Sequence, residues 1–172
     1  MQGSIEQFLE QVARRGSWVG GGSVAAFSAA LAAALLEKLV HEPRAARRLG
    51  EVRRECLTLL ERDAEAFARV IRTTRRRDRR AFRAALQAAT EVPCRVFEHA
   101  QGVQAACRIA QRAVKPRFQS DLRCAMAVAM AAGESARTLV HTNLAWLGDP
   151  AYTKRVRRRL QAAGSHALNR LR

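Results

Sequence analysis

Aromatic residues are scarce in this sequence, and lysine is scarce among its many basic residues. Phe, Trp and Tyr make up 5% of the 172 residues, although 48% are hydrophobic. The core must therefore be built largely from alanine, leucine and valine, which allow helices to pack closely. This composition predicts an all-α protein.

Cysteine is also sparse, and no two cysteines form a C-x-x-C pair. The four are dispersed among apolar residues, at Cys56, Cys94, Cys107 and Cys124. This spacing indicates buried free thiols in a reducing compartment. The sequence also has no cluster of residues typical of a metal site, and we expect no bound metal.

No segment of the sequence resembles a secretory leader, with a basic start, an apolar stretch and a cleavage site. The longest apolar run ends at Glu37-Lys38, short of the roughly 18 residues that a transmembrane helix needs. We therefore expect a cytoplasmic protein with no membrane partner. The length fits a single domain, residues 1–172, with a substantial core.

Negative charge is in short supply. The chain has 31 Lys and Arg against 15 Asp and Glu, which gives a formal net charge of +16. The basic residues concentrate in Arg72–Arg80 and Lys154–Arg159, and such runs favour acidic partners such as nucleic acid or a polyanionic small molecule. A solvated surface in an arginine-rich sequence is the alternative explanation.

Apolar residues recur at helical spacing along almost the whole chain. Ser4 caps a first helix, with Gln7 completing a capping box, and Gly16 ends it. Further helices are expected over residues 23–41, 44–73, 78–90, 93–113, 120–147 and 151–168. Pro93 begins the fifth of these seven helices, Ser120 is the N-cap candidate of the sixth, and Gly148 ends that helix. The predicted fold is an antiparallel helical bundle of about six to seven helices.

Three successive glycines, Gly20, Gly21 and Gly22, precede Ser23 and a strongly apolar helix. Glycines let a ligand approach the backbone closely, and Ser23 can cap the first helical turn. The exposed amides at the positive end of the helix dipole favour an anion. A tightly packed turn between two helices is the other explanation.

Asp63 lies within an apolar stripe of the helix expected over residues 44–73. Positions 56, 60, 63, 67 and 70 advance by threes and fours and therefore share one face. Burial of a charged carboxylate costs several kcal/mol unless it is paired or protonated, so Asp63 has either a partner or a raised pKa. A raised pKa suits a general acid or base, whereas an ion pair with an arginine would be structural.

Asp121 follows directly after Ser120, in the expected first turn of a helix. An acidic residue there stabilises the helix dipole by roughly 0.3–1 kcal/mol, which is its structural explanation. Lys115 and Arg117, just before this turn, would also hold a carboxylate or phosphate at the same helix end.

Five motifs in this order resemble the formiminotransferase-cyclodeaminase C-terminal domain and its stand-alone relatives, the methenyltetrahydrofolate cyclohydrolases. They are Gly20–Ala26, Asp63–Phe67, Val92-Pro93, Ser120-Asp121 and Asn143-Leu144. The resemblance covers about residues 4–147. Trp18-Val19 depart from the pattern, because the family has a proline before the glycines.

The resemblance implies an all-α homodimer that binds a tetrahydrofolate derivative and needs no cofactor. Such an enzyme hydrolyses 5,10-methenyltetrahydrofolate to 10-formyltetrahydrofolate or deaminates 5-formiminotetrahydrofolate. On this interpretation Asp63 and Asp121 are the acid/base or charge-stabilising groups. The substrate-binding residues are then Gly20, Gly21, Gly22, Ser23, Ser120 and, as a weaker candidate, Asn143.

A polyglutamate tail on the folate would be held by the basic surface. The alternative function is a non-catalytic basic helical dimer that binds nucleic acid, an acidic partner, or folate without turnover. Nucleic acid is not favoured, because few aromatic residues interleave with the arginine runs.

Overall fold

The structure of the protein is a computed structural model that describes residues 4–166, with side chains up to residue 164. Its elements are α1 (Ile5–Ala13), α2 (Gly21–Leu39), α3 (Pro43–Arg75), α4 (Arg79–Ala110), the short 3-10 helix η1 (Pro116–Phe118), α5 (Gln119–Leu147) and α6 (Pro150–His166). This range contains no strand, so the all-α prediction is confirmed. Residues 167 and 168, which were expected to end the last helix, lie outside the described residues.

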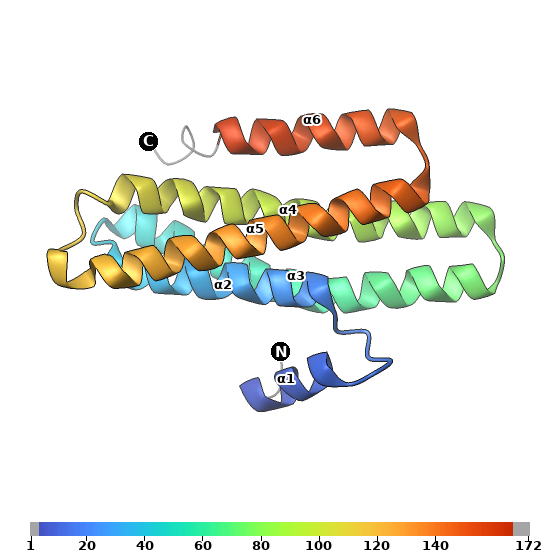
Figure 1. Ribbon diagram of the computed structural model, residues 1–172, viewed down its shortest axis with the longest axis horizontal. Helices are drawn as coiled ribbons and strands as arrows, with labels where there is room; N and C mark the ends of the chain where they lie inside the picture. Colours follow the sequence, from blue (N-terminus) through green and yellow to red (C-terminus); the bar gives the residue numbers. More distant parts are fainter. Residues whose placement is uncertain (1–3, 167–172) are drawn as a thin grey trace.

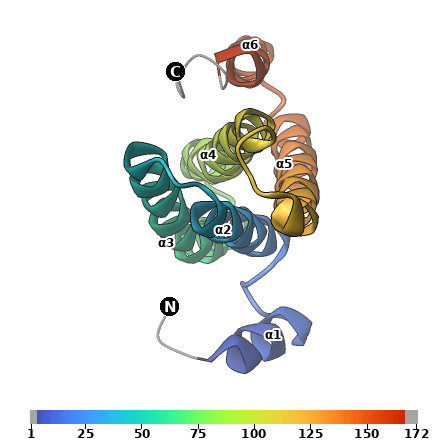
Figure 2. The same cartoon turned by 90° about the vertical axis from the view of Figure 1, so that its left-hand side faces the viewer.

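The four long helices form the body of the molecule. Successive helices from α2 to α5 run in opposite directions, with α1 and α6 on opposite sides of this bundle (Figure 1). Viewed along the bundle, α2 lies between α3 and α5 (Figure 2). The predicted antiparallel helical bundle is therefore confirmed.

Helix α2 is the central helix because small residues cover most of its surface. Ala26, Ala29 and Ala33 are fully buried, which lets α3, α4 and α5 all pack closely on it. Helix α2 is long and apolar enough to cross a membrane by length and composition alone. The length of the uninterrupted apolar run, which ends at Glu37-Lys38, was therefore too strict a criterion for excluding such a helix. However, 56% of its apolar window is buried within the bundle, as in the core helix of a soluble protein.

Helix α1 begins as the sequence predicts. The Ser4 hydroxyl accepts a hydrogen bond from the Gln7 amide at 3.2 Å, and the Gln7 side chain accepts one from the Ser4 amide at 3.0 Å. This capping box satisfies two amides that have no partner within the helix. Phe8 joins α1 to the bundle, because its ring lies 5.0 Å from that of Phe27.

Pro93 does not begin a helix, contrary to the sequence prediction. It lies inside α4, which continues unbroken from Arg79 to Ala110. A proline has no amide hydrogen and therefore leaves the carbonyl four residues earlier, that of Ala89, without its helical partner. The Asn143 side chain from α5 donates a hydrogen bond to that carbonyl at 3.3 Å. A neighbouring helix thus compensates for the break.

Three of the four cysteines are buried, as expected. Burial raises the pKa of the Cys56 and Cys94 thiols to about 12 and that of Cys107 to about 11. Cys124 is exposed, so the prediction of a buried thiol was wrong there. The buried stripe of α5 passes through Leu122 and Ala125, and the two positions between them, Arg123 and Cys124, are exposed.

Candidate active site

Asp63 lies on α3 where this helix passes the beginning of α2. The Ser23 hydroxyl donates toward Oδ2 of Asp63 at 3.0 Å and lies 3.2 Å from the carbonyl oxygen of Leu60. Ser23 therefore does not cap its own helix, contrary to prediction. Gly20 occupies the N-cap position, with no side-chain hydrogen bond.

The environment of Asp63 raises the pKa of its carboxyl group. Burial is the largest cause, and hydrogen bonds from the Ser23 side chain and backbone oppose it only in part. Among the described residues, no arginine or lysine forms an ion pair with Asp63. Of the two outcomes that the sequence left open, a raised pKa or an arginine partner, the structure has the first.

The three glycines are not equivalent. A Cβ at Gly22 would lie 2.6 Å from Oδ2 of Asp63 and still closer to Oδ1, so any larger residue must displace the carboxylate. A Cβ at Gly21 would make ordinary contacts with Leu139, and one at Gly20 would meet nothing within 4 Å. Gly22 therefore makes room for Asp63, whereas Gly20 and Gly21 leave the backbone at the start of α2 accessible.

Two aromatic side chains lie beside this helix end. Trp18, just before the glycines, and Phe67, one turn after Asp63, meet edge to face with ring centroids 6.1 Å apart. They are 44% and 40% exposed, so Phe67 lies at the surface although its position shares a helix face with the buried Cys56 and Leu60. In the sequence this pair is visible only as a tryptophan two residues before Gly20 and a phenylalanine four residues after Asp63. Neither position indicates whether the aromatic side chain lies in the core or at the surface.

Asp121 lies at the opposite end of α2 from Asp63. Its carboxylate forms an exposed ion pair with Lys38, with Nζ and Oδ2 3.4 Å apart, whereas Asp63 contacts Ser23. Fifteen residues of helix separate Ser23 from Lys38, which corresponds to about 22 Å. Asp63 and Asp121 of one chain therefore do not form one site.

Ser120 is not the N-cap residue of α5, contrary to prediction. It lies in the first turn, and Phe118 takes the N-cap position with no side-chain hydrogen bond. No helix was predicted over residues 114–119, but this segment contains η1, which continues directly into α5. Helix α5 therefore begins at Gln119, before Ser120.

The chain matches a family model of formiminotransferase-cyclodeaminase over residues 4–162. The chain belongs to the formiminotransferase-cyclodeaminase family. This confirms the family that the five sequence motifs predicted. No curated protein sequence matches the chain.

A solved structure of this family has a similar fold. The crystal structure of formiminotetrahydrofolate cyclodeaminase from Thermotoga maritima superposes with a TM-score of 0.89 and 22% sequence identity, over 96% of this chain and 90% of that one. At this identity the likeness shows the fold alone. The bundle of helices therefore has the same fold as that structure, and the chemistry has to be argued from the residues.

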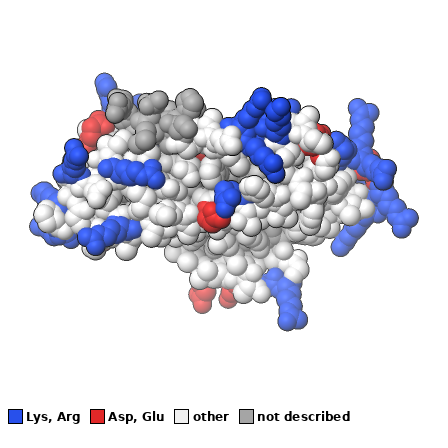
Figure 3. Space-filling model, turned by 45° about the horizontal axis from the view of Figure 1, so that its top comes forward, with Lys and Arg blue, Asp and Glu red and all other residues white. Residues whose placement is uncertain are grey.

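The first turn of α6 lies beside the beginning of α4, whereas the basic run on α6 continues along α4, where Arg159 pairs with Glu91 and Glu98. Arg83 Nη2 lies 3.0 Å from Oδ2 of Asp149, just before α6, and the Tyr152 hydroxyl donates to the Gln87 carbonyl at 3.3 Å. These contacts place the first turns of α6 against the beginning of α4, next to the exposed residues 72–80. Figure 3 shows Lys and Arg spread over the face that carries α6, with few Asp and Glu between them.

Between residues 4 and 166, no group of three or more His, Cys, Asp or Glu side chains lies close enough together to hold a metal ion. The chemical groups that the site offers are the Asp63 carboxyl, the Ser23 hydroxyl and the backbone at the start of α2.

Proposed function

We propose that this protein is a folate one-carbon enzyme whose site lies where Asp63 meets the first turn of α2. The reaction is either hydrolysis of 5,10-methenyltetrahydrofolate to 10-formyltetrahydrofolate or deamination of 5-formiminotetrahydrofolate. The observation that carries the proposal is a half-buried carboxyl group with a raised pKa, in a member of this family, that has no cationic partner among residues 4–164. A carboxyl group whose pKa is raised is a better general acid, and a stronger base once ionised, than an ordinary aspartate.

Asp63 serves both reactions as a proton carrier. In hydrolysis the carboxylate takes one proton from the water that adds to the methenyl carbon, and then gives it to N5 as the bond from that carbon to N5 breaks. The second proton of that water leaves to solvent as the C–O bond becomes the formyl C=O. In deamination N10 attacks the formimino carbon, and the carboxyl group carries the N10 proton to the departing ammonia. In both cases the negative form also stabilises the cationic carbon centre. The Ser23 hydroxyl holds the carboxylate in position throughout.

The surface beside Asp63 suits a flat ligand. Trp18 and Phe67 expose ring faces and edges, and planar heteroaromatic rings stack on such side chains. Gly20 and Gly21 carry no side chain that would block access to the amides of the first turn of α2. We assign the folate ring system to this surface, bounded by the glycines, Ser23 and the aromatic pair.

We also propose that the protein is a homodimer. Ile5 and Leu9 on α1 are exposed, as are Val24 and Leu31, which are seven residues apart on one face of α2. Large apolar residues on the surface of two adjacent helices favour a second copy of the chain as their cover. Sedimentation equilibrium tests this, because Leu31→Glu should shift a dimer toward monomer. A monomeric wild-type protein would contradict the proposal.

Asn143, the weaker substrate-binding candidate, is not part of the proposed folate site. Its amide is engaged with the Ala89 carbonyl and repairs the gap left by Pro93. Ser120 and Asp121 join the site only if a second subunit brings them there, since they lie far from Asp63 within one chain.

The decisive experiment is turnover of 5,10-methenyltetrahydrofolate and of 5-formiminotetrahydrofolate, with Asp63→Asn and Asp121→Asn beside the wild type. Glu65→Gln is the matched control, because it removes a carboxylate from an exposed position on the same helix. We expect Asp63→Asn to lose at least a hundredfold in kcat and Glu65→Gln to match the wild type. Loss in Asp121→Asn as well would indicate a site shared between subunits. Absence of turnover of both substrates by the wild type would refute the proposal.

A second candidate function is binding of a polyanion by the basic residues at the end of the bundle where α4 begins. The contact of the first turn of α6 with the beginning of α4 favours it, because it brings Lys154 and Arg155 toward residues 72–80, while Arg159 is engaged by Glu91 and Glu98. Fluorescence anisotropy with a labelled single-stranded oligonucleotide at several salt concentrations tests it. Binding that weakens steeply with salt is expected, with a slope close to the number of phosphate contacts.

A further inference from the structure

Trp146, the second of the two tryptophans in the chain, lies at the surface near the end of α5. Its side chain is 57% exposed. A buried aromatic side chain removes about 150–250 Å² from water, so an uncovered tryptophan leaves a large hydrophobic contribution unused. Such a residue close to a candidate site is a candidate contact for the ligand.

The face of α5 that carries Trp146 is the one that meets the beginning of α2. A Cβ at Gly21 would lie 3.7 Å from a methyl carbon of Leu139, so Leu139 faces the first turn of α2. Trp146 is seven residues farther along α5, which turns the helix through about 700° and advances it by about 10 Å. Its direction is therefore within about 20° of that of Leu139. Because α5 runs opposite to α2, Trp146 lies past the first residue of α2, where α3, α4 and α5 continue without it (Figure 1).

Phe67 of α3 lies at the same level of the bundle as Trp146. Val70 and Leu147 belong to one buried cluster with Leu86 of α4, so the ends of α3 and α5 meet over the beginning of α4. Val70 is three residues after Phe67, and Leu147 directly follows Trp146. An exposed aromatic side chain thus stands on each of the two helices that extend past α2 on either side.

This arrangement matches the two ring systems of the proposed substrate. In 5,10-methenyltetrahydrofolate the reacting carbon joins N5 of the pterin to N10 of the aminobenzoyl group, so both rings lie close to the atom that reacts. The pterin has hydrogen-bonding edges, which suit the accessible amides at Gly20 and Gly21 beside Trp18. The aminobenzoyl ring is flat and apolar and needs only an aromatic face, which Trp146 offers.

We propose that Trp146 is a substrate-binding residue that stacks on the aminobenzoyl ring, while Trp18 and Phe67 contact the pterin. This rests on the folate site proposed above and adds a residue from α5 to it. A second copy of the chain is the other cover available to Trp146, and the test separates the two.

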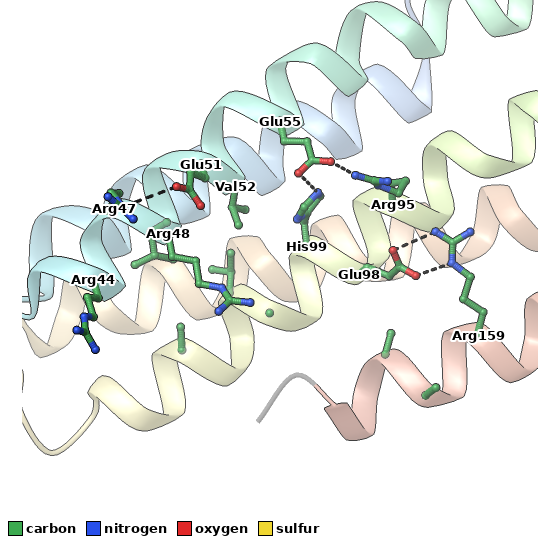
Figure 4. Close-up of a pocket in the computed structure, with 16 residues that line it drawn as sticks. Arg44, Arg47, Arg48, Glu51, Val52, Glu55, Arg95, Glu98, His99 and Arg159 are labelled. Carbon is green, nitrogen blue, oxygen red and sulfur yellow. Dashed lines mark hydrogen bonds and ion pairs between the residues drawn. The ribbon is translucent and has the colours of Figure 1, made fainter. Parts of the chain in front are cut away.

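The test must also exclude a cleft of about 870 Å³ between α3, α4 and α6, which is large enough for the same ligand. Five arginines against three glutamates line it, so it is basic. Figure 4 shows charged side chains of its walls paired with one another, since Glu55 lies between Arg95 and His99 and Glu98 binds Arg159. Within the described residues its lining contains no Phe, Tyr or Trp on which a ring would stack. His99 reports on binding there.

NMR of the full-length protein tests the contact directly. The two indole N–H signals are assigned with Trp18→Phe and Trp146→Phe, and the ligand is 5-formyltetrahydrofolate, which neither proposed reaction consumes. We expect both indole signals to shift, with nuclear Overhauser effects between Trp146 and the aminobenzoyl protons. Effects from Trp146 to the pterin protons instead, or a shift of His99 with both indoles unchanged, would overturn the proposal.

Calorimetric titration with the same ligand measures the energetic effect. Trp146→Ala should raise Kd about tenfold and Trp146→Phe less than about threefold, because a smaller ring still stacks. Met130→Ala is the matched control, since Met130 is 56% exposed on α5 but lies nine residues from Leu139, about half a turn away from the face of Trp146. It should bind as the wild type does. In turnover, Trp146→Ala should raise KM and leave kcat within about threefold, because Trp146 carries no proton.

The outcomes separate this proposal from the folate site on which it rests. No binding of 5-formyltetrahydrofolate by the wild type would refute the site itself. Binding with equal Kd for the wild type and Trp146→Ala would overturn only the role of Trp146. If a second copy covers Trp146, Trp146→Ala shifts sedimentation equilibrium toward monomer and leaves Kd unchanged, which also overturns it. Circular dichroism checks that each variant is folded.

Discussion

The contact between Asn143 and the Ala89 carbonyl should stabilise the fold only because Pro93 is present. Pro93 has no amide hydrogen, so the Ala89 carbonyl depends on the Asn143 side chain, 3.3 Å away. In a Pro93→Ala variant the new amide at position 93 restores the helical hydrogen bond to Ala89. We therefore expect Asn143→Ala to destabilise the protein more in the wild-type background than in the Pro93→Ala background.

The size of this difference follows from the hydrogen bond involved. An intramolecular hydrogen bond contributes about 0.5–1.5 kcal/mol, and an acceptor left without a partner costs about 1–3 kcal/mol. Asn143 also loses packing atoms when it is shortened, but this loss is the same in both backgrounds and cancels. We expect a coupling free energy between Asn143 and Pro93 of about 1 kcal/mol.

The assay is urea denaturation of the four proteins of a double-mutant cycle, all at one protein concentration. Pro93→Ala alone changes the free energy of unfolding in two opposing ways, because it restores a helical hydrogen bond but also leaves a cavity where the fully buried proline ring was. The coupling free energy of the cycle is therefore the quantity that tests the contact. Equal effects of Asn143→Ala in both backgrounds, within about 0.3 kcal/mol, would show that Asn143 does not replace the missing helical bond.

Three further predictions concern single residues. Gly22→Ala should lower the free energy of unfolding by about 1–3 kcal/mol, because its Cβ displaces the Asp63 carboxylate, whereas Gly20→Ala, with open space around it, should change it far less; equal denaturation midpoints would contradict this. Because folding raises the pKa of Asp63 above its ordinary value of 3.8, its contribution to stability is present at lower pH and is lost as the pH rises through the raised pKa. Denaturation from pH 3.5 to 7 should therefore show Asp63→Asn gaining stability relative to the wild type as the pH rises, and a constant difference would refute the raised pKa. One thiol, Cys124, should react rapidly with a thiol-specific reagent in the native protein, since the other three are buried; peptide mapping that finds the label elsewhere would contradict the burial pattern.

The helices and their packing faces could be predicted from local patterns. The capping box at Ser4 and the glycine stop at Gly148 both depend on residues close together in the sequence, and the structure has each of them. The partial burial of Asp63 also followed from its place in an apolar stripe, although the sequence left open whether its pKa is raised or an arginine pairs with it.

Two of the errors came from partners that are distant in the sequence. Pro93 was expected to begin a helix, because its local effect is to break one, and Asn143, fifty residues later, compensates for it. Ser23 was expected to cap its own helix but binds Asp63 on α3. In both cases a short-range rule was overridden by a hydrogen bond between helices.

The sequence by itself determined that this chain folds as an all-α bundle of the formiminotransferase-cyclodeaminase family, because helical periodicity and the five motifs lie along the chain. Only the tertiary structure decided that Gly22 makes room for Asp63, that Asp63 and Asp121 lie at opposite ends of α2, and that α3, α4 and α6 enclose a basic cleft. These features depend on how helices are placed relative to one another. That placement arises from side-chain packing between segments far apart in the sequence, which no local pattern records.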